Sequence, residues 1–303
     1  MNVVTLLPSA TEIVSALGVT PVGVSHSCDH PPGVRDLPTI TRSSVDASAD
    51  SATIDEQVLE AERAGGVYEI GLEELERADP DLIVTQGICE VCAVDTVLVR
   101  EAIEQLGLDC DVLTTDPHGL EDVFSDVERI SRALGREERA GDLVAECRAR
   151  VERVRERVPH GRRPRVLDID WMDPVMVGGH WVPELVEYAG GEYGLVEAGE
   201  ASTPVEFERV LEYDPEALVV APCGFRIEQT TETVGDLVNR AGWSNLTAVR
   251  EGRVFVLDGS AHLNRPSHRL VDSLEALAGV LHPERFDAPP TDAVRRLATP
   301  PAE

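Results

Sequence analysis

The chain of 303 residues contains no lysine, so all 27 of its basic residues are arginine. A phosphate-binding loop of the Gly-x-x-x-x-Gly-Lys type is therefore excluded. The sequence also lacks Gly-x-Gly-x-x-Gly after its first apolar run and has no Gly-x-Ser-x-Gly. Dinucleotide binding on a glycine-rich turn and hydrolysis at a nucleophile elbow thus lack their sequence motifs, and nothing in the sequence specifies an enzymatic reaction.

Long apolar runs are also missing. No stretch reaches the ~20 apolar residues that cross a bilayer, so we expect a protein that does not span a membrane. The first residues resemble a strand, Val3 to Leu7, and not a secretion signal or lipid anchor. As written, the sequence predicts a cytoplasmic protein, which would be extracytoplasmic only if its N-terminus is processed. Six cysteines are too few in a chain of this length to form a disulfide framework.

Positive charge is scarce, because 56 acidic residues face the 27 arginines and give a formal net charge of -29. Such an excess, spread over the whole sequence, is typical of proteins from halophilic organisms, whose surfaces stay hydrated in concentrated salt. Nucleic-acid binding requires a basic stripe that neutralises phosphates, and none is visible. We therefore expect no nucleic-acid partner.

Short apolar runs alternate with helical patterns, which is typical of parallel sheets connected by right-handed crossovers. From residue 119 to 158 apolar residues recur at helical spacing, with Gly135 able to bend or break the helix. The sequence predicts an α/β protein of two Rossmann-like lobes with mostly parallel sheets, joined by one long helix or two nearly continuous ones. The predicted parts are a first lobe (1–118), a linking helix (119–158), a second lobe (159–284) and a flexible tail (285–303).

Ligands of wound parallel sheets bind beyond the carboxyl ends of the strands, and polar or aromatic residues gather there in this sequence. Two such ends facing each other would form one cleft. Both Trp171 and Trp181 fall in these loops, where an aromatic wall would suit a flat ligand, although core packing is an alternative. The candidate ligand-binding residues are Pro8, Ser9, His26, Asp29, Gln86, Gly87, Trp171, His180, Trp181, Phe225, His262 and Arg265.

Thiols in the same loops suggest a metal. Cys89 and Cys92 form a Cys-x-x-Cys pair, and Cys28 and Cys223 would complete a thiolate site for zinc, iron or copper(I). Packing of these cysteines as small buried side chains is an equally good interpretation, and a hydrogen-bonded loop imidazole is the alternative for His26. The carboxylates of Asp168, Asp170 and Asp173 are interpreted as solvated surface groups.

The sequence also resembles a known family. The motifs are Leu6-Leu7-Pro8-Ser9-Ala10-Thr11-Glu12, Asp79-Pro80-Asp81-Leu82-Ile83-Val84 and Asp214-Pro215-Glu216-Ala217-Leu218-Val219-Val220. They are similar to the substrate-binding proteins of cobalamin and iron-siderophore ABC importers, of the class III periplasmic-binding-protein fold, and most of all to a cobalamin-binding-protein-like branch without a signal. The resemblance implies two lobes joined by a rigid helix, with ligand contacts at Pro8-Ser9, 26–29, 86–92, Trp171 and 223–225.

The leading hypothesis is thus a non-enzymatic binder of cobalamin or another corrinoid, or a related metal chelate. Its partner would be an ABC permease or a corrinoid-salvage protein. The alternative is a cytoplasmic metalloprotein or enzyme with a Cys/His site for a transition metal such as zinc or iron. A regulatory protein that binds partners through its acidic faces would leave no recognisable sequence pattern.

Overall fold

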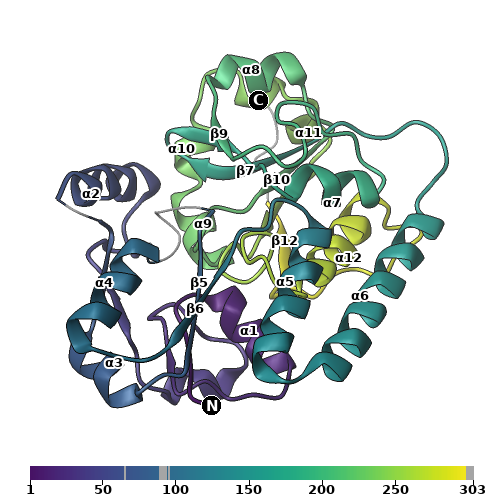
Figure 1. Cartoon of the computed structure of the whole chain (residues 1–303). Coiled ribbons are helices and arrows are strands. Elements are labelled where there is room, and N and C mark those ends of the chain that lie inside the picture. Colours follow the sequence, from purple (N-terminus) through teal and green to yellow (C-terminus); the bar gives the residue numbers. More distant parts are fainter. Residues whose placement is uncertain (65, 89–93, 95, 298–303) are drawn as a thin grey trace. The chain divides into compact units, whose positions relative to one another are not determined.

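The computed structural model describes residues 1–64, 66–88, 94 and 96–297. The chain divides into two compact units. Unit 1 comprises Met1–Asp46, Glu56–Pro117 and Glu121–Glu146, and unit 2 comprises Ala47–Asp55, His118–Leu120 and Cys147–Glu303. The predicted α/β class of two lobes with mostly parallel sheets is confirmed (Figure 1). The domain limits predicted from the sequence stay a prediction.

Unit 1 contains a parallel sheet of four strands in the order β2-β1-β5-β6. A separate antiparallel pair, β3 with β4, lies outside that sheet. The elements that lie wholly in unit 1 are β1 (Val3–Thr5), α1 (Pro8–Ala16), β2 (Gly23–Val24), η1 (Pro32–Asp36), β3 (Thr41–Ser43), β4 (Tyr68–Ile70), α3 (Leu72–Ala78), β5 (Leu82–Gln86), α4 (Thr96–Leu106) and β6 (Asp111–Thr115).

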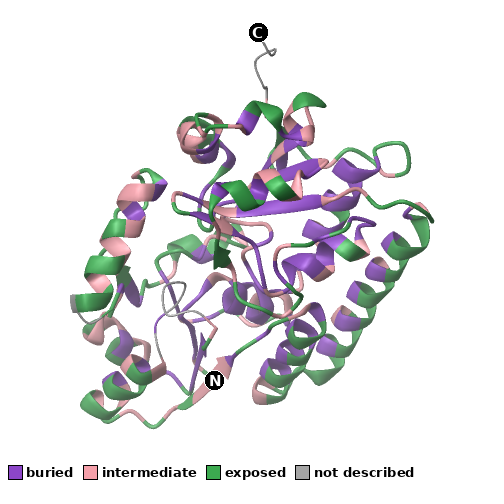
Figure 2. Cartoon of the chain, turned by 90° about the horizontal axis from the view of Figure 1, so that it is seen from above, coloured by how far each residue is buried: buried purple, intermediate pink, exposed green. Residues whose placement is uncertain are grey.

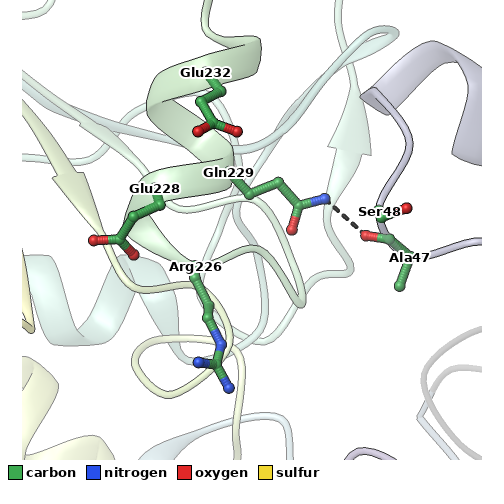
Figure 3. Close-up of a pocket in the computed structure, with 6 residues that line it drawn as sticks. All are labelled: Ala47, Ser48, Arg226, Glu228, Gln229 and Glu232. Atoms are coloured by element: carbon green, nitrogen blue, oxygen red, sulfur yellow. Dashed lines mark hydrogen bonds between the residues drawn. The ribbon is translucent and has the colours of Figure 1, made fainter.

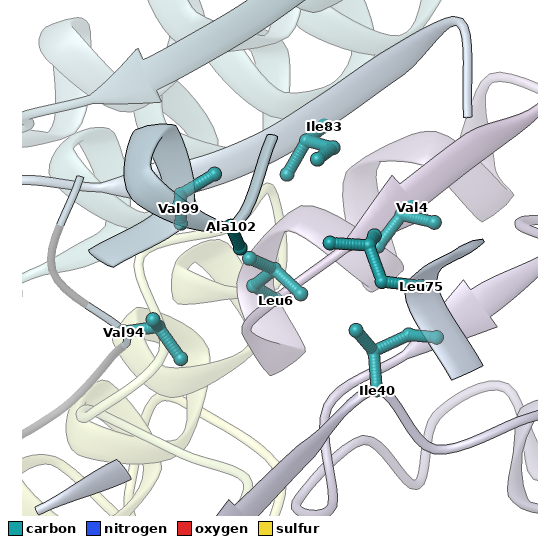
Figure 4. Packing of buried hydrophobic residues seen from close by; sticks show 8 residues of the cluster. All are labelled: Val4, Leu6, Ile40, Leu75, Ile83, Val94, Val99 and Ala102. Carbon is teal, nitrogen blue, oxygen red and sulfur yellow. The ribbon is translucent and has the colours of Figure 1, made fainter. Parts of the chain in front are cut away.

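Apolar side chains of several of these elements form one core (Figure 4). Val4 of β1 and Ile83 of β5 are fully buried neighbours of Leu75 from α3 and Val99 from α4. Strands that alternate with helices in the sequence therefore bury their shared apolar surface here, which is the main stabilising contribution to such a unit. This packing fixes the strand ends from which the loops of unit 1 emerge.

The segment predicted as a linking helix forms two helices, α5 (Leu120–Leu134) and α6 (Glu137–Arg157). They are separated at Gly135, whose φ of +62° is one that glycine adopts without steric cost. The alternative of two nearly continuous helices is thus the correct one. Another helix, α2 (Ser51–Ala64), was not expected from the sequence.

Unit 2 contains a mixed sheet of six strands in the order β12-β11-β10-β7-β8-β9. Its centre, β11-β10-β7, is parallel, whereas β12, β8 and β9 pair antiparallel. Its elements are β7 (Val166–Met172), β8 (Val175–Val177), α7 (Val182–Tyr188), β9 (Thr203–Pro204), α8 (Phe207–Tyr213), β10 (Ala217–Val220), α9 (Ile227–Thr233), α10 (Gly235–Val238), η2 (Trp243–Asn245), α11 (Thr247–Arg250), β11 (Val254–Leu257), α12 (Leu270–Leu281) and β12 (Val294–Arg296).

Strand β12 lies in the segment for which the sequence predicted a flexible tail, so that expectation is wrong for these residues. Val294 is buried and pairs with Leu257 of β11, and this pairing gives the segment a fixed place at the edge of the sheet. Figure 2 shows the strands coloured largely as buried, with exposed colour on the outer faces of the helices. In the described part of the chain, no helix is both long enough and apolar enough to cross a membrane.

Candidate functional site

The parallel strands of unit 1 bring three predicted loops to one edge of its sheet. Because β2, β1 and β5 are parallel neighbours, their carboxyl ends lie side by side. Pro8 and Ser9 follow β1, residues 26–29 follow β2, and Gln86 ends β5 with Gly87 after it. We call these residues the unit 1 rim. Within it, Ser9 and Gln86 are buried, whereas Gly87 is exposed.

Cys28 lies in a small polar network beneath the unit 1 rim. Its Sγ is 3.0 Å from Oγ1 of Thr11 and 3.1 Å from Oγ of Ser25, and Oγ1 of Thr11 is 2.6 Å from that of Thr5. The thiol is 5% exposed. These contacts accord with the packing interpretation of Cys28 and connect the loop after β2 to α1 and β1.

His26 and Asp29 also have partners within unit 1. The backbone N–H of His26 donates to Oγ1 of Thr41, and Nδ1 of its ring is 3.1 Å from the same oxygen. The ring lies 5.5 Å from that of Tyr68. Asp29 accepts a hydrogen bond of 3.4 Å from Arg35. Both side chains are therefore oriented by neighbours while His26 stays exposed.

In unit 2 the parallel strands β7, β10 and β11 likewise bring their carboxyl ends to one edge. Trp171, near the end of β7, the loop 222–226 after β10 and the loop 258–265 after β11 form what we call the unit 2 rim. The two loops are joined by hydrogen bonds from Gly224 N to Gly259 O and from Ser260 N to Phe225 O. A Cβ at Gly259 would lie 2.1 Å from the carbonyl oxygen of Pro222, so this approach requires glycine.

Two aromatic side chains contact each other at the unit 2 rim. The rings of Trp171 and Phe225 meet edge to face, with centroids 5.2 Å apart. Phe225 is buried, while Trp171 is half-buried. Phe225 thus packs against the indole, and Trp171 is the one of the pair with surface left for a ligand. Cys223, two residues before Phe225, is exposed.

The segment of Gly178, Gly179, His180 and Trp181 follows β8, which is antiparallel to β7, so strand direction alone does not bring it to the rim edge. Trp181 is only 7% exposed, and its indole N–H donates to Leu263 O at 2.5 Å. His180 has a positive φ of 52°, and its ring lies 5.6 Å from those of both His118 and Trp181. The buried indole of Trp181 therefore fixes the loop after β11.

The last two candidates belong to the loop after β11. Nδ1 of His262 is 3.5 Å from Oγ of Ser273, and Arg265 is 8% exposed. Asn264 donates to Ala221 O at 2.8 Å and thereby ties this loop to the end of β10. The structure thus places Trp171 near the end of β7, and Phe225, His262 and Arg265 in the loops after the neighbouring strands of the same sheet.

The interpretation of Asp168 as a solvated surface group is wrong. Asp168 lies on the central strand β7, is 1% exposed, and neither of its carboxylate oxygens has a hydrogen-bond partner among the described residues. Burial, followed by the nearby charge of Asp170, raises the pKa of Asp168 well above its ordinary value. Asp173 does behave as a surface group and pairs with Arg240 at 2.9 Å. Because acidic residues are so frequent in the chain, nothing in the sequence distinguished this buried carboxyl group from the exposed ones.

An open pocket of about 480 Å³ adjoins the unit 2 rim (Figure 3). Four of its residues come from α9 and the residue before it, and two come from a distant segment of the sequence that belongs to unit 2. The Gln229 side chain donates to Ala47 O at 2.7 Å and joins the two walls. Sequence reasoning missed this pocket because no motif links its walls. Its lining residues are Ala47, Ser48, Arg226, Glu228, Gln229 and Glu232.

The predicted metal site is only partly within the described residues, because Cys89 and Cys92 lie outside them. Cys28 belongs to unit 1 and Cys223 to unit 2. Among the residues that the structure describes, no group of three or more His, Cys, Asp or Glu side chains is placed to hold a metal ion. The thiolate site therefore stays a prediction.

Comparison with known proteins gives consistent matches. Residues 3–261 match the family described as periplasmic binding protein. A Bacillus subtilis protein named as an uncharacterized ABC transporter substrate-binding lipoprotein is 22% identical over 94% of this chain and 81% of its own length. A vitamin B12-binding protein from Vibrio campbellii is 24% identical over 90% and 86%. A periplasmic heme-binding protein from Pseudomonas aeruginosa has a similar structure, with a TM-score of 0.70, 20% identity and coverage of 98% and 95%.

These matches correct the predicted location. The expectation of a cytoplasmic protein is wrong, because the related proteins are named as a lipoprotein and as periplasmic. That expectation rested on the first residues of the sequence alone. The family match covers well over half of the residues, including strands of both units. The chain belongs to the family of periplasmic binding proteins.

Proposed function

We propose that this chain is the ligand-binding component of an ABC importer and that it binds a corrinoid such as cobalamin, or a related metal chelate. The half-buried indole of Trp171 on the unit 2 rim is the observation that carries the proposal. It contacts Phe225 edge to face and is only partly buried, so part of the indole is available to an apolar ligand surface. Flat macrocycles are the ligands that such an aromatic contact favours.

Relatives support the same ligand class. The Vibrio campbellii protein is named for vitamin B12, and the Pseudomonas aeruginosa protein is named for heme. Both ligands are metal chelates built on a planar macrocycle. A transporter role is supported by the name of the Bacillus subtilis relative. The partner of this chain would then be a membrane permease.

On the unit 1 rim, we propose that Pro8, His26, Asp29 and Gly87 contribute ligand contacts. These residues follow neighbouring parallel strands, and none of them is counted among the buried residues. Pro8 opens α1, where its fixed φ suits the first helical position. Cys28 would act indirectly, since its thiol holds the loop through Thr11 and Ser25.

Calorimetric titration of the purified protein with cyanocobalamin, hemin and ferrichrome tests the proposal. We expect one ligand per chain for at least one of them, with a Kd in the micromolar range or tighter. Trp171→Ala removes the aromatic contact and should weaken binding about tenfold, which corresponds to about 1.4 kcal/mol. Phe286→Ala, another half-buried aromatic of unit 2 outside the rim, is the matched control and should leave affinity unchanged. Absence of binding for all three ligands at about 100 µM would overturn the proposal.

A further inference from the structure

The imidazole of His26 on the unit 1 rim is held at one ring nitrogen and open at the other. Its Nδ1 lies 3.1 Å from Oγ1 of Thr41, and the same oxygen accepts the backbone N–H of His26 at 3.2 Å. Thr41 is fully buried, and the ring of Tyr68 lies 5.5 Å from the imidazole. Within the parts of the chain that the structure describes, Nε2 of His26 has no hydrogen-bond partner. Because Nε2 lies across the ring from Nδ1, it faces away from the buried hydroxyl.

Two other side chains of the same loop carry atoms that coordinate metals, and both are engaged. Cys28 is 5% exposed, and its Sγ lies within 3.1 Å of two hydroxyl oxygens. The carboxylate of Asp29 accepts a hydrogen bond from Arg35. His26 is exposed. Of these three side chains, His26 is the one that offers an accessible lone pair on a fixed ring.

We infer that Nε2 of His26 is an axial ligand to the metal of the bound chelate, so that the chain prefers chelates whose metal has an exchangeable axial position. This inference rests on the proposed function and narrows its ligand class. In the exchange, Nε2 forms a bond to the metal and the water that held the axial position leaves. No electron is transferred, and His26 neither gains nor loses a proton.

The contact with Thr41 is the arrangement that a metal-binding imidazole requires. A ligating histidine usually donates its other ring N–H to a neighbouring oxygen, which fixes the tautomer and the orientation of the ring. Oγ1 of Thr41 is placed to accept the proton of Nδ1, and the lone pair then lies on Nε2. Desolvation by the surrounding loop lowers the pKa of His26 below its ordinary value, so the imidazole is neutral at about pH 7. Neutral imidazole is the form that binds first-row transition metals.

Cobalamins that differ in one axial ligand test the inference. The full chain is titrated at about pH 7 with aquocobalamin, whose axial water exchanges, and with cyanocobalamin, whose cyanide blocks that position. Dicyanocobinamide, with cyanide on both sides of the cobalt, is a second blocked ligand. We expect aquocobalamin to bind at least about tenfold more tightly than either blocked ligand. Its visible absorption spectrum should change on binding as nitrogen replaces water on the cobalt.

Substitutions then assign the effect to one nitrogen. His26→Phe keeps a ring against Tyr68 but removes both ring nitrogens, so the preference for aquocobalamin over cyanocobalamin should fall to about one and the spectral change should disappear. Thr41→Val removes the oxygen that orients the imidazole and should reduce the same preference while keeping part of the spectral change. His160→Phe, the same replacement at an exposed position of unit 2, should change neither.

Each outcome has a separate meaning. If aquocobalamin binds no more tightly than cyanocobalamin and its spectrum is unchanged, the proposed function stands and the inference is overturned. If the spectral change persists in His26→Phe, another group binds the cobalt and the assignment to His26 is overturned. If neither cobalamin binds, and hemin and ferrichrome also fail to bind, the proposed function and the inference both fail.

Discussion

The carboxyl group of Asp168 lies in the interior of unit 2, on the strand that leads to Trp171. The space around it is tight, since a Cβ at Gly178 would lie 2.4 Å from Oδ2 of Asp168. Tyr193 donates its hydroxyl to Gly178 O at 2.7 Å, so the polar groups beside the carboxyl are themselves engaged. A buried carboxylate without a donor is unfavourable, and such a group stays protonated instead.

The pH dependence of stability follows from that protonation. The pKa of Asp168 is raised in the folded state, so above about pH 4 the folded chain holds a proton that the unfolded chain has lost. The free energy of unfolding then falls by about 1.4 kcal/mol per pH unit from this group as the pH rises, until the folded pKa is passed. Asp168→Asn keeps the shape and removes the titration. We expect the variant to gain stability relative to the wild type as pH rises from 5 to 7.

Urea unfolding at pH 5, 6 and 7 measures this difference. Asp173→Asn is the control, because its carboxyl is half-exposed and paired with Arg240. The prediction is contradicted if the difference in the free energy of unfolding between wild type and Asp168→Asn is the same at all three pH values. That result would show that Asp168 is ionised in the folded protein.

At the scale of elements, each unit contains a helix that ends on an aspartate in the left-handed conformation and is followed by proline and a strand. Asp79 ends α3 with φ 43°, and Asp214 ends α8 with φ 46°. Aspartate tolerates this conformation better than most residues. Only Asp214 also caps another helix, since its carboxylate accepts hydrogen bonds of 2.8 Å from both N and Oγ1 of Thr247, the first residue of α11.

The pair provides a matched test of that cap. Asp214→Ala should lower the free energy of unfolding by about 1–2 kcal/mol more than Asp79→Ala, because both lose an aspartate from the left-handed region but only the first loses a cap. Chemical denaturation of the two variants checks this, and Asp214→Asn should recover most of the loss because it retains an acceptor oxygen. Equal losses for the two alanine variants would contradict a stabilising cap.

The sequence predicts the main elements well where apolar runs are long and alternate with helices. The strands at 82–86, 166–172 and 217–220 and the break at Gly135 follow from composition and periodicity. The pairs β3 with β4 and β8 with β9 could not be predicted, because strands of two or three residues carry no detectable alternation. The rim loops followed from strand direction, whereas the pocket depends on Gln229 meeting residue 47, a long-range contact without a local signal.

At the scale of the whole molecule, the net charge of -29 opposes compaction of the chain. Added salt screens this repulsion, with a Debye length that falls from about 10 Å at 0.1 M to about 3 Å at 1 M. We therefore expect Tm to rise with KCl, with most of the gain below about 0.5 M, and NaCl to have the same effect. Calorimetric scans measure this, and a Tm that is constant or falls over that range would contradict the role given to charge.

The sequence motifs indicate the fold of the molecule but do not indicate its ligand. Motifs such as Asp79-Pro80 and Asp214-Pro215 lie where a helix ends and the next strand begins. A resemblance in these motifs therefore indicates the fold. One feature proposed to choose a ligand is the indole of Trp171, a single side chain on this common framework. Fold class was thus predictable, and the ligand is not fixed by it.

The most direct test of the central claim is a crystal structure of the full chain with dicyanocobinamide bound. The claim is that the strand-end loops hold the ligand, so the macrocycle should lie against the indole of Trp171. A macrocycle bound at any surface away from the carboxyl ends of β7, β10 and β11 would contradict it.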